Sequence, residues 1–250
     1  MDFSDQALIL KIGKFKETDL WVRMLSPVRG LYTAFAFGGS RSIKRFCGCL
    51  DFLNTVLVRV DAPRSKGYMA LKEGTLINSP RRLRFDLNRL GMAVNCIKFM
   101  EAFEIAPDSA EATHRLIGEL LDVLEEDDNL PVLMPMLFRF RFASLQGFAP
   151  QINACRICNT PVSNLPDFFF QTVEGGIVCP ECMRKSRPGP CVRLAKDSLA
   201  ALLSIQQDEP KSWKYIDFDR EMRAQCADAV DGFIHYHVGL AWQGSYFKRI

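Results

Sequence analysis

The sequence contains little histidine and no long apolar run. Only three histidines occur in 250 residues, and they form no Ser-His-Asp or Cys-His set and accompany no glycine-rich phosphate loop. No apolar run approaches the roughly 18 residues needed to span a bilayer, and the opening residues are polar and acidic, unlike a signal peptide. We therefore expect a cytoplasmic protein that is not an enzyme and that does not enter a membrane.

Cysteine is present in a pattern that indicates a metal site. Cys155 and Cys158 form one CxxC pair, and Cys179 and Cys182 form a second pair after twenty residues. This spacing is typical of four-cysteine zinc sites, because a CxxC turn lets two thiolates reach one tetrahedral ion. The alternatives are two unrelated disulfides or chance cysteines. Four thiolates would close the site, so we predict a structural zinc ion.

The stretch between the two cysteine pairs is typical of a β-hairpin. Residues 168–178 contain two β-rich runs joined at Glu174-Gly175-Gly176, where glycine can supply positive φ. The segment is therefore interpreted as a zinc ribbon inserted in the chain.

The charge is divided unevenly along the chain. Residues 1–84 carry 15 Lys/Arg and 7 Asp/Glu, a net of +8, whereas residues 85–250 carry 17 and 22, a net of −5. Such an asymmetry suggests that the basic part binds a polyanion such as nucleic acid. The alternative is a basic surface that only keeps the protein soluble.

The first 80 residues are typical of a small β-barrel. Short apolar runs alternate with glycine- and proline-containing turns, which predicts five strands. A five-stranded Greek-key barrel of this size is an OB-fold, a fold that commonly binds oligonucleotides. The expected strands cover residues 7–13, 20–25, 31–37, 52–60 and 68–76.

Basic residues fall in the expected turns and strands of this barrel, where they can neutralise phosphates. The candidate DNA-binding residues are Lys14, Lys16, Arg23, Arg29, Arg41, Lys44, Arg45, Arg64 and Lys66. Aromatic residues of the same region could stack on bases, although most are expected in the core. The candidates for stacking, of which we expect one or two to act, are Trp21, Tyr32, Phe35, Phe37 and Phe46.

From residue 81 the apolar period becomes helical. We expect a first helix that starts near Phe85 and ends near Pro107. Further helices are expected over residues 110–125, 132–146, 195–206 and 219–240. The apolar stripe of the 132–146 helix is normally core, but it could instead form a groove for an acidic partner, with Arg139 and Arg141 beside it. The expected domains are an OB-fold at 1–80, a helical domain at 81–150, a zinc ribbon at 151–190 and completing helices at 191–250.

Several short motifs, taken in order, resemble the bacterial recombination protein O (RecO) family. They are Phe15-Lys16-Glu17-Thr18-Asp19-Leu20, Gly38-Gly39-Ser40-Arg41, Leu145-Gln146-Gly147-Phe148-Ala149-Pro150, and Gly175-Gly176-Ile177-Val178-Cys179-Pro180-Glu181-Cys182. The resemblance covers nearly the whole chain. It implies an α+β multidomain protein with an N-terminal OB-fold, a helical body and an inserted zinc element.

The same resemblance implies a non-enzymatic role in recombinational DNA repair. Its expected activities are binding of single- and double-stranded DNA, annealing of complementary strands and help in loading recombinase onto strands coated by single-strand binding protein. Its implied partners are the ring-forming protein RecR and the acidic C-terminal tail of single-strand binding protein. The alternatives are a zinc-ribbon adaptor between proteins, which needs no annealing activity, and a zinc nuclease, which four cysteines without an adjacent histidine or aspartate disfavour.

Overall fold

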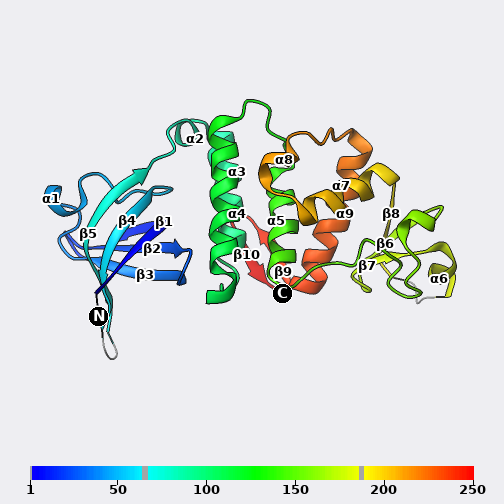
Figure 1. Ribbon diagram of the computed structural model, residues 1–250, viewed down its shortest axis with the longest axis horizontal. Helices are drawn as coiled ribbons and strands as arrows, with labels where there is room; N and C mark the ends of the chain where they lie inside the picture. Colours follow the sequence, from blue (N-terminus) through cyan, green and yellow to red (C-terminus); the bar gives the residue numbers. More distant parts are fainter. Residues whose placement is uncertain (1, 64–66, 186–188) are drawn as a thin grey trace. The chain divides into compact units, whose positions relative to one another are not determined.

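The computed structural model describes residues 2–63, 67–185 and 189–250. The chain divides into two compact units, of which the first contains residues 1–90 and 103–125 and the second contains residues 91–102 and 126–250. The chain is of the α+β class, with a five-stranded N-terminal sheet and a helical body (Figure 1). The two units are described separately below.

The first unit is built around one sheet of five strands. Its order is β1-β2-β3-β5-β4, and β1 also pairs with β4, so that the sheet closes into a barrel. All pairs are antiparallel except β3 with β5, where Ala34 lies opposite Met69 and Phe35 opposite Ala70. All five strands that we predicted are confirmed, with bounds that differ by a few residues: β1(Asp2–Lys14), β2(Leu20–Ser26), β3(Gly30–Ala36), β4(Thr55–Asp61) and β5(Met69–Asn78).

Alternating side chains of these strands fill the barrel, as the period of two requires. Asp5 and Ser26 are buried polar residues of these strands, and Asp5 accepts hydrogen bonds from Ser26 Oγ at 3.0 Å and from Tyr32 Oη at 2.9 Å. Burial, and then the neighbouring Asp5, raise the pKa of Tyr32, which keeps its hydroxyl a donor. The buried core comprises Ala7, Ile9, Val22, Met24, Tyr32, Ala34, Ala36, Phe46, Cys49, Val56, Val58, Val60 and Leu71.

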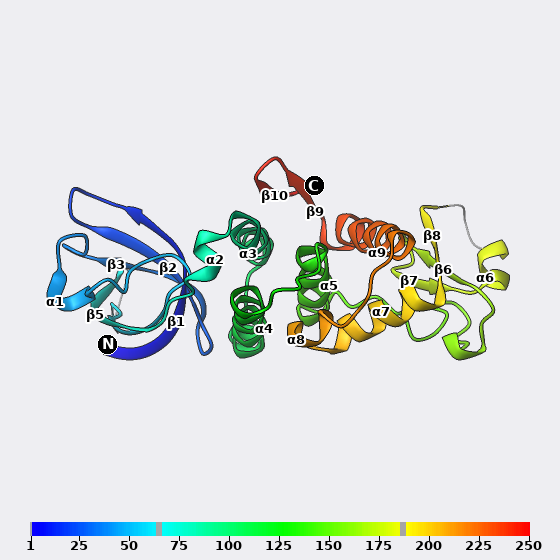
Figure 2. The same ribbon diagram turned by 90° about the horizontal axis from the view of Figure 1, so that it is seen from above.

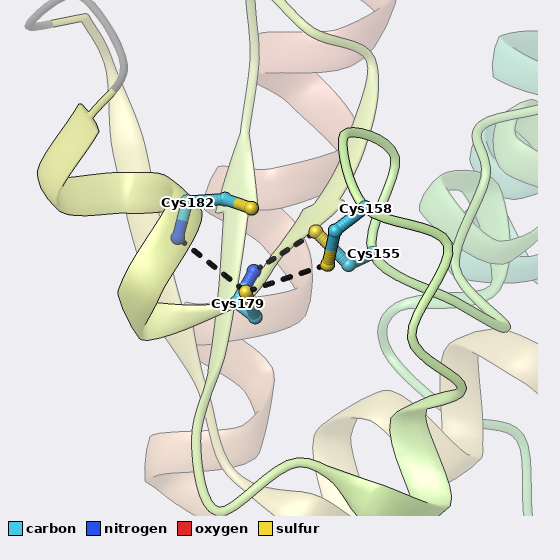
Figure 3. A group of neighbouring side chains, drawn as sticks. All are labelled: Cys155, Cys158, Cys179 and Cys182. Carbon is cyan, nitrogen blue, oxygen red and sulfur yellow. Dashed lines mark hydrogen bonds between the residues drawn. The ribbon is translucent and has the colours of Figure 1, made fainter.

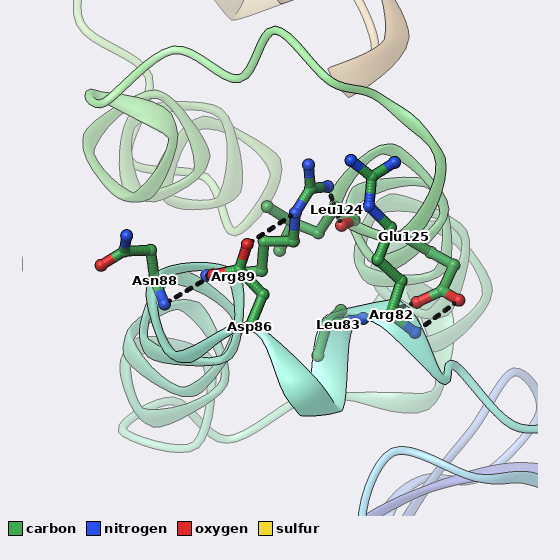
Figure 4. Close-up of polar contacts among 7 residues, drawn as sticks. All are labelled: Arg82, Leu83, Asp86, Asn88, Arg89, Leu124 and Glu125. Carbon is green, nitrogen blue, oxygen red and sulfur yellow. Dashed lines mark hydrogen bonds and ion pairs between the residues drawn. The ribbon is translucent and has the colours of Figure 1, made fainter.

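A carboxylate joins the end of the barrel to the helices of the first unit. Glu125, in α4(Pro107–Glu126), accepts hydrogen bonds from three successive backbone N–H groups at the start of α2(Arg82–Phe85). Figure 4 shows Glu125 with two of the donors, Arg82 and Leu83. The distances from the Glu125 oxygens to the nitrogens of Arg81, Arg82 and Leu83 are 3.0, 2.9 and 2.8 Å. These are the donors that a helix start leaves without intrahelical partners.

A buried arginine makes a second connection to the same helix. Arg89, near the start of α3(Leu87–Met100), donates from Nη1 to the carbonyl oxygen of Leu124 at 2.6 Å (Figure 4). Its guanidinium also contacts Asp86, whose carboxylate accepts the backbone N–H groups of Asn88 and Arg89 and thereby caps α3. The single turn α1(Ile43–Phe46) also belongs to this unit.

The second unit combines a helical body with a small sheet. The sheet has the order β7-β6-β8. Helix α5 is apolar and buried over most of its surface, and Arg139 and Arg141 are among its half-buried residues. Of the part of the chain that is described, no helix is both long and apolar enough to cross a membrane. The elements are α5(Met134–Leu145), η1(Val162–Asn164), β6(Phe168–Gln171), β7(Gly176–Val178), α6(Pro180–Lys185), β8(Cys191–Leu194), α7(Lys196–Gln207), α8(Pro210–Trp213) and α9(Arg220–Phe233).

The predicted helix over 219–240 is two residues too long, and its last turn is of a different type. Helix α9 ends at Phe233, continues as a π-helical turn, η2(Ile234–Val238), and stops at Gly239, whose φ is +68°. A hairpin follows, formed by β9(Leu240–Gln243) and β10(Tyr246–Arg249). Glycine ends the helix because it adopts the left-handed conformation without strain, and the aromatic residues beyond it favour strands.

We predict that Glu125→Ala destabilises the first unit. The substitution removes the common acceptor of three backbone N–H groups, so the free energy of unfolding should fall by about 2 kcal/mol. Urea unfolding followed by circular dichroism measures this change. The control is Glu111→Ala, at an exposed position of the same helix, and equal effects of the two substitutions would contradict the proposed role of Glu125.

The same carboxylate should make stability depend on pH. Partial burial raises the pKa of Glu125, but the three backbone hydrogen bonds outweigh it and the net pKa is lowered. Its stabilisation is therefore complete above the unfolded-state pKa of about 4.3 and is lost as pH falls through the lower folded-state value. Denaturation between neutral pH and acid should show a smaller loss of stability for Glu125→Gln than for the unchanged protein.

Candidate metal centre and nucleic-acid interface

The four cysteines predicted to bind metal lie together in the second unit. The sulfur atoms of Cys155, Cys158, Cys179 and Cys182 are all within 4.8 Å of one another (Figure 3). The Cys158 and Cys179 sulfurs are 3.8 Å apart, which matches the separation of about 3.8 Å expected in a tetrahedron with Zn–S bonds of about 2.3 Å. All nine cysteines of the chain are free thiols, so the disulfide interpretation finds no support.

Two tight turns bring the thiols together. In the first, the Cys155 N–H donates to the Thr160 carbonyl and the Asn159 N–H donates to the Cys155 carbonyl, with Asn159 at φ +59°. In the second, β7 ends at Val178 and α6 begins at Pro180. Backbone N–H groups of Cys179 and Cys182 lie 3.4 Å from the sulfurs of Cys155 and Cys179 respectively. Amide donors of this kind stabilise thiolates.

The crowded thiols have pKa values that move in opposite directions. The Thr160 side chain and backbone, followed by Cys155, lower the pKa of Cys158 to about 6. Burial, and then hydrogen bonding with the neighbouring cysteines, raises the pKa of Cys182 to about 12. Four adjacent thiolates repel one another unless a cation lies between them. The donor set therefore fits a thiophilic metal ion, held by four ligands with no position left for a substrate.

The predicted hairpin between the cysteine pairs is confirmed, and its turn contacts the helical body. Strands β6 and β7 pair from Phe169 opposite Val178 to Gln171 opposite Gly176. His237 Nε2 lies 2.7 Å from the Thr172 carbonyl oxygen, and a Cβ at Gly175 would lie 2.8 Å from the same nitrogen. A side chain at Gly175 would therefore displace the ring of His237 from the turn.

In the first unit, most of the predicted DNA-binding residues are on the surface of the barrel. Six are exposed: Lys14, Lys16, Arg29, Arg41, Lys44 and Arg45, while Arg23 is half-buried in β2. The Arg45 guanidinium donates to the Phe37 carbonyl at 2.5 Å, and that of Arg29 lies over the Phe3 ring, 3.7 Å from its centroid. Arg64 and Lys66 lie outside the described residues.

Four aromatic side chains form a surface cluster beside these cations. Phe35, in β3, contacts the rings of Phe15, Phe37 and Tyr68, with centroid distances of 4.9, 6.3 and 4.8 Å. Phe15 and Phe37 are each 47% exposed and Tyr68 is 69% exposed. Lys16 Nζ lies 5.8 Å from the centre of the Phe15 ring. Large exposed rings with adjacent cations are the features of a surface on which bases stack.

Sequence reasoning found only half of this aromatic cluster. Of its stacking candidates, Phe35 and Phe37 belong to the cluster, Tyr32 and Phe46 are in the barrel core, and Trp21 is half-buried. Phe15 and Tyr68 were not among the candidates. The signal that could have found them is their position next to the loops after β1 and before β5, since these two loops flank the ligand face of an OB-fold.

The two arginines predicted to bind a partner already contact other residues of the second unit. Arg139 donates to Asp231 at 3.0 Å and to Asn95 at 3.2 Å. Arg141 donates from Nε to the Asp208 carbonyl at 3.3 Å. A partner that binds Arg139 has to compete with Asp231 for its guanidinium.

The fold and the sites define a class of protein: an α+β chain with a barrel that exposes cations and rings, and a helical body that carries a four-cysteine metal site. The family model described as Recombination protein O N terminal matches residues 1–80, and the one described as Recombination protein O C terminal matches residues 84–246. The chain belongs to the recombination protein O family.

Relatives of full length carry a consistent name. The chain is 44% identical to proteins named DNA repair protein RecO from Nitratidesulfovibrio vulgaris (strain Hildenborough) and from Oleidesulfovibrio alaskensis, and 42% identical to the protein of that name from Solidesulfovibrio magneticus. In each case the match covers 100% of this chain and 100% of the relative.

We predict that Cys155→Ser removes bound metal and lowers stability. Elemental analysis of the unchanged protein should find one metal ion per chain, and the variant should lose it. The melting temperature should fall by about 5–10 °C, since each kcal/mol is worth about 2–4 °C in a chain of this size. The control is Cys191→Ser, an exposed cysteine outside the cluster; a full metal content in Cys155→Ser would overturn the assignment.

Proposed function

We propose that this chain is a non-enzymatic DNA-binding protein of recombinational DNA repair, and that its barrel is an OB-fold that binds DNA. The observation that carries the proposal is the cluster of exposed rings beside exposed cations on the barrel. The strand order β1-β2-β3-β5-β4, with β1 returning to β4, supports the OB-fold. The name of the relatives, DNA repair protein, supports the role in repair.

The proposed activity is to bind single- and double-stranded DNA and to anneal complementary strands. Cations on the barrel neutralise phosphates and release counterions, which lowers the repulsion between two strands. The rings around Phe35 hold unpaired bases by stacking without selecting a sequence. A strand held in this way keeps the pairing edges of its bases accessible to a complementary strand. We also propose that the protein helps to load recombinase onto strands coated by single-strand binding protein.

We further propose that the metal is zinc and that its role is structural. Four cysteine ligands and the closed geometry support this assignment. The proposed domains are the OB-fold at 1–80, a helical domain at 81–150, the zinc ribbon at 151–190 and the helices at 191–250 that complete the helical domain. The proposed partners are RecR and the acidic tail of single-strand binding protein, and the tail would contact Arg139 and Arg141. The proposed location is the cytoplasm.

A second candidate function is a protein adaptor that uses the zinc element as its docking face. The exposed side chain of Ile157, between the first two cysteines, favours this alternative. Pull-down of a partner that persists after the barrel is neutralised, without annealing by the unchanged protein, would select the adaptor over the annealing protein.

We predict that DNA affinity falls steeply with salt and that Arg41→Glu/Lys44→Glu weakens it. For single-stranded DNA the slope of log affinity against log salt should decrease in magnitude by about 1.4 if each residue neutralises one phosphate. Fluorescence anisotropy at several salt concentrations measures the slope. The control is Lys211→Glu/Arg220→Glu, at exposed positions of the second unit. Salt-independent binding, unchanged in both variants, would contradict the proposal.

We also predict that Phe37→Ala/Tyr68→Ala selectively weakens binding of single strands. Each ring that stacks on a base contributes about 1–3 kcal/mol, whereas the bases of a duplex are already stacked. Affinity for a single strand should therefore fall at least fivefold, and affinity for a duplex should change less. Phe85→Ala, at an exposed ring in α2, is the matched control. Equal losses for the two kinds of DNA would argue against stacking.

A further inference from the structure

The hairpin of β9 and β10 carries a second set of exposed rings, in the second unit. Trp242 is 44% exposed and Tyr246 is 53% exposed, and the tyrosine follows directly after the turn. Gly244, at the turn, has φ +62° and no atom within 4 Å of the position where a Cβ would lie. Figure 2 shows the hairpin standing out from the end of η2. Trp242 pairs with Phe247 and Tyr246 pairs with Gln243, so the two rings belong to opposite faces of the hairpin.

The charges around the hairpin favour an anionic ligand. Residues 85–250 have a net charge of −5, yet residues 232–250 contain no Asp or Glu, and they include Lys248 and Arg249. Lys98 of α3 adds a third cation, because its Nζ lies 6.0 Å from the centre of the Trp242 ring. Two acids lie on adjoining elements. Asp231 forms an ion pair with Arg139, and Glu101 directly follows the last residue of α3.

One face of the hairpin is fixed to the body of its unit. The Phe247 ring lies 5.0 Å from that of Phe99 and 4.8 Å from that of Trp242, its direct cross-strand neighbour. Lys98 Nζ donates to the Ser245 carbonyl at 2.7 Å, and Arg249 donates to the Ala102 carbonyl at 3.4 Å. These contacts hold the strands in one orientation.

The opposite face of the hairpin presents polar, cationic and aromatic groups. Successive residues of a strand point to opposite faces, and directly opposed residues share a face. Phe247 packs inward, so Tyr246 and Lys248, with the cross-strand neighbours Gln243 and Ala241, point away from α3. Tyr246, Lys248 and Gln243 are all exposed. Trp242 lies on the inward face, where its ring contacts the ring of Phe247 and the side chain of Lys98.

We propose that the β9–β10 hairpin is a second binding surface for single-stranded nucleic acid. Tyr246 contacts a base, and Lys248, which lies on the same face of the hairpin, contacts a flanking phosphate. Rings favour a single strand over a duplex because its bases are free to stack. Tyrosine on a fixed β-ribbon loses little conformational freedom on binding. A chain with this surface and a separate barrel surface can hold two strands at once. This consequence deepens the annealing function proposed above, and it is the one part of the inference that rests on that function.

Photochemical cross-linking of the full-length protein tests the location directly. A bromodeoxyuridine-substituted single strand is irradiated with the unchanged protein and with Arg41→Glu/Lys44→Glu, and the cross-linked peptides are identified by mass spectrometry. We expect cross-links at Tyr246 in both proteins. Cross-links confined to the barrel would overturn the hairpin proposal and leave the barrel proposal intact. Cross-links confined to the hairpin would overturn the barrel proposal and leave the hairpin proposal intact.

Affinity measurements provide the second test. In the Arg41→Glu/Lys44→Glu background, Tyr246→Ala/Lys248→Ala should lower affinity for a single strand at least fivefold, the effect of losing one stacked base. The matched control is Tyr215→Ala/Lys211→Ala, which removes an exposed tyrosine and an exposed lysine elsewhere in the second unit. Equal affinities of the two double variants would overturn the proposal. Unchanged strand binding with lost binding of an acidic peptide would overturn it in favour of a peptide site.

Discussion

The packing of four sulfur atoms within 4.8 Å of one another is the constraint on which the metal element of the second unit depends. A sheet of three short strands needs a hydrophobic face or a packed helix to be stable, and Phe170 of β6 contacts Phe233 of α9. The apolar contacts of the cysteine cluster itself are few. A cation at the centre of the thiols would convert repulsion into four bonds and fix both turns. The hairpin turn then lies where His237 reaches the Thr172 carbonyl, so the order of the metal element extends to η2 and the end of α9.

In the first unit, the strand order of the barrel brings together an aromatic surface cluster that could not be predicted from local sequence. Phe15 and Tyr68 are 53 positions apart in the chain, but each contacts the ring of Phe35. The parallel pairing of β3 with β5 places Phe35 opposite Ala70, two residues after Tyr68. Arg45 then joins the cluster by its hydrogen bond to the Phe37 carbonyl. The rings and cations are therefore brought together by strand order, while the core needs only alternating apolar residues.

The same distinction explains what could be predicted from sequence. The five strands, the hairpin between the cysteine pairs and the gathering of four cysteines follow from local period, turn glycines and ligand spacing. Glu125 could not be identified, because its partners are more than 40 positions away and an acidic residue in an acidic run is typical of a solvated helix end. The β9–β10 hairpin was missed because the helical period of α9 continues up to Gly239, whose positive φ changes the direction of the chain.

The uneven charge gives the two proposed nucleic-acid surfaces different physical characters. Around the barrel, an excess of eight positive charges in residues 1–84 attracts a polyanion from a distance, and salt screens this attraction. The hairpin belongs to the part of the chain with a net charge of −5, so attraction there depends on a local absence of acids and on contact with the rings. Binding at the barrel is therefore expected to be governed mainly by counterion release and binding at the hairpin mainly by stacking. A protein with both can capture a strand electrostatically and retain the unpaired bases of another by contact.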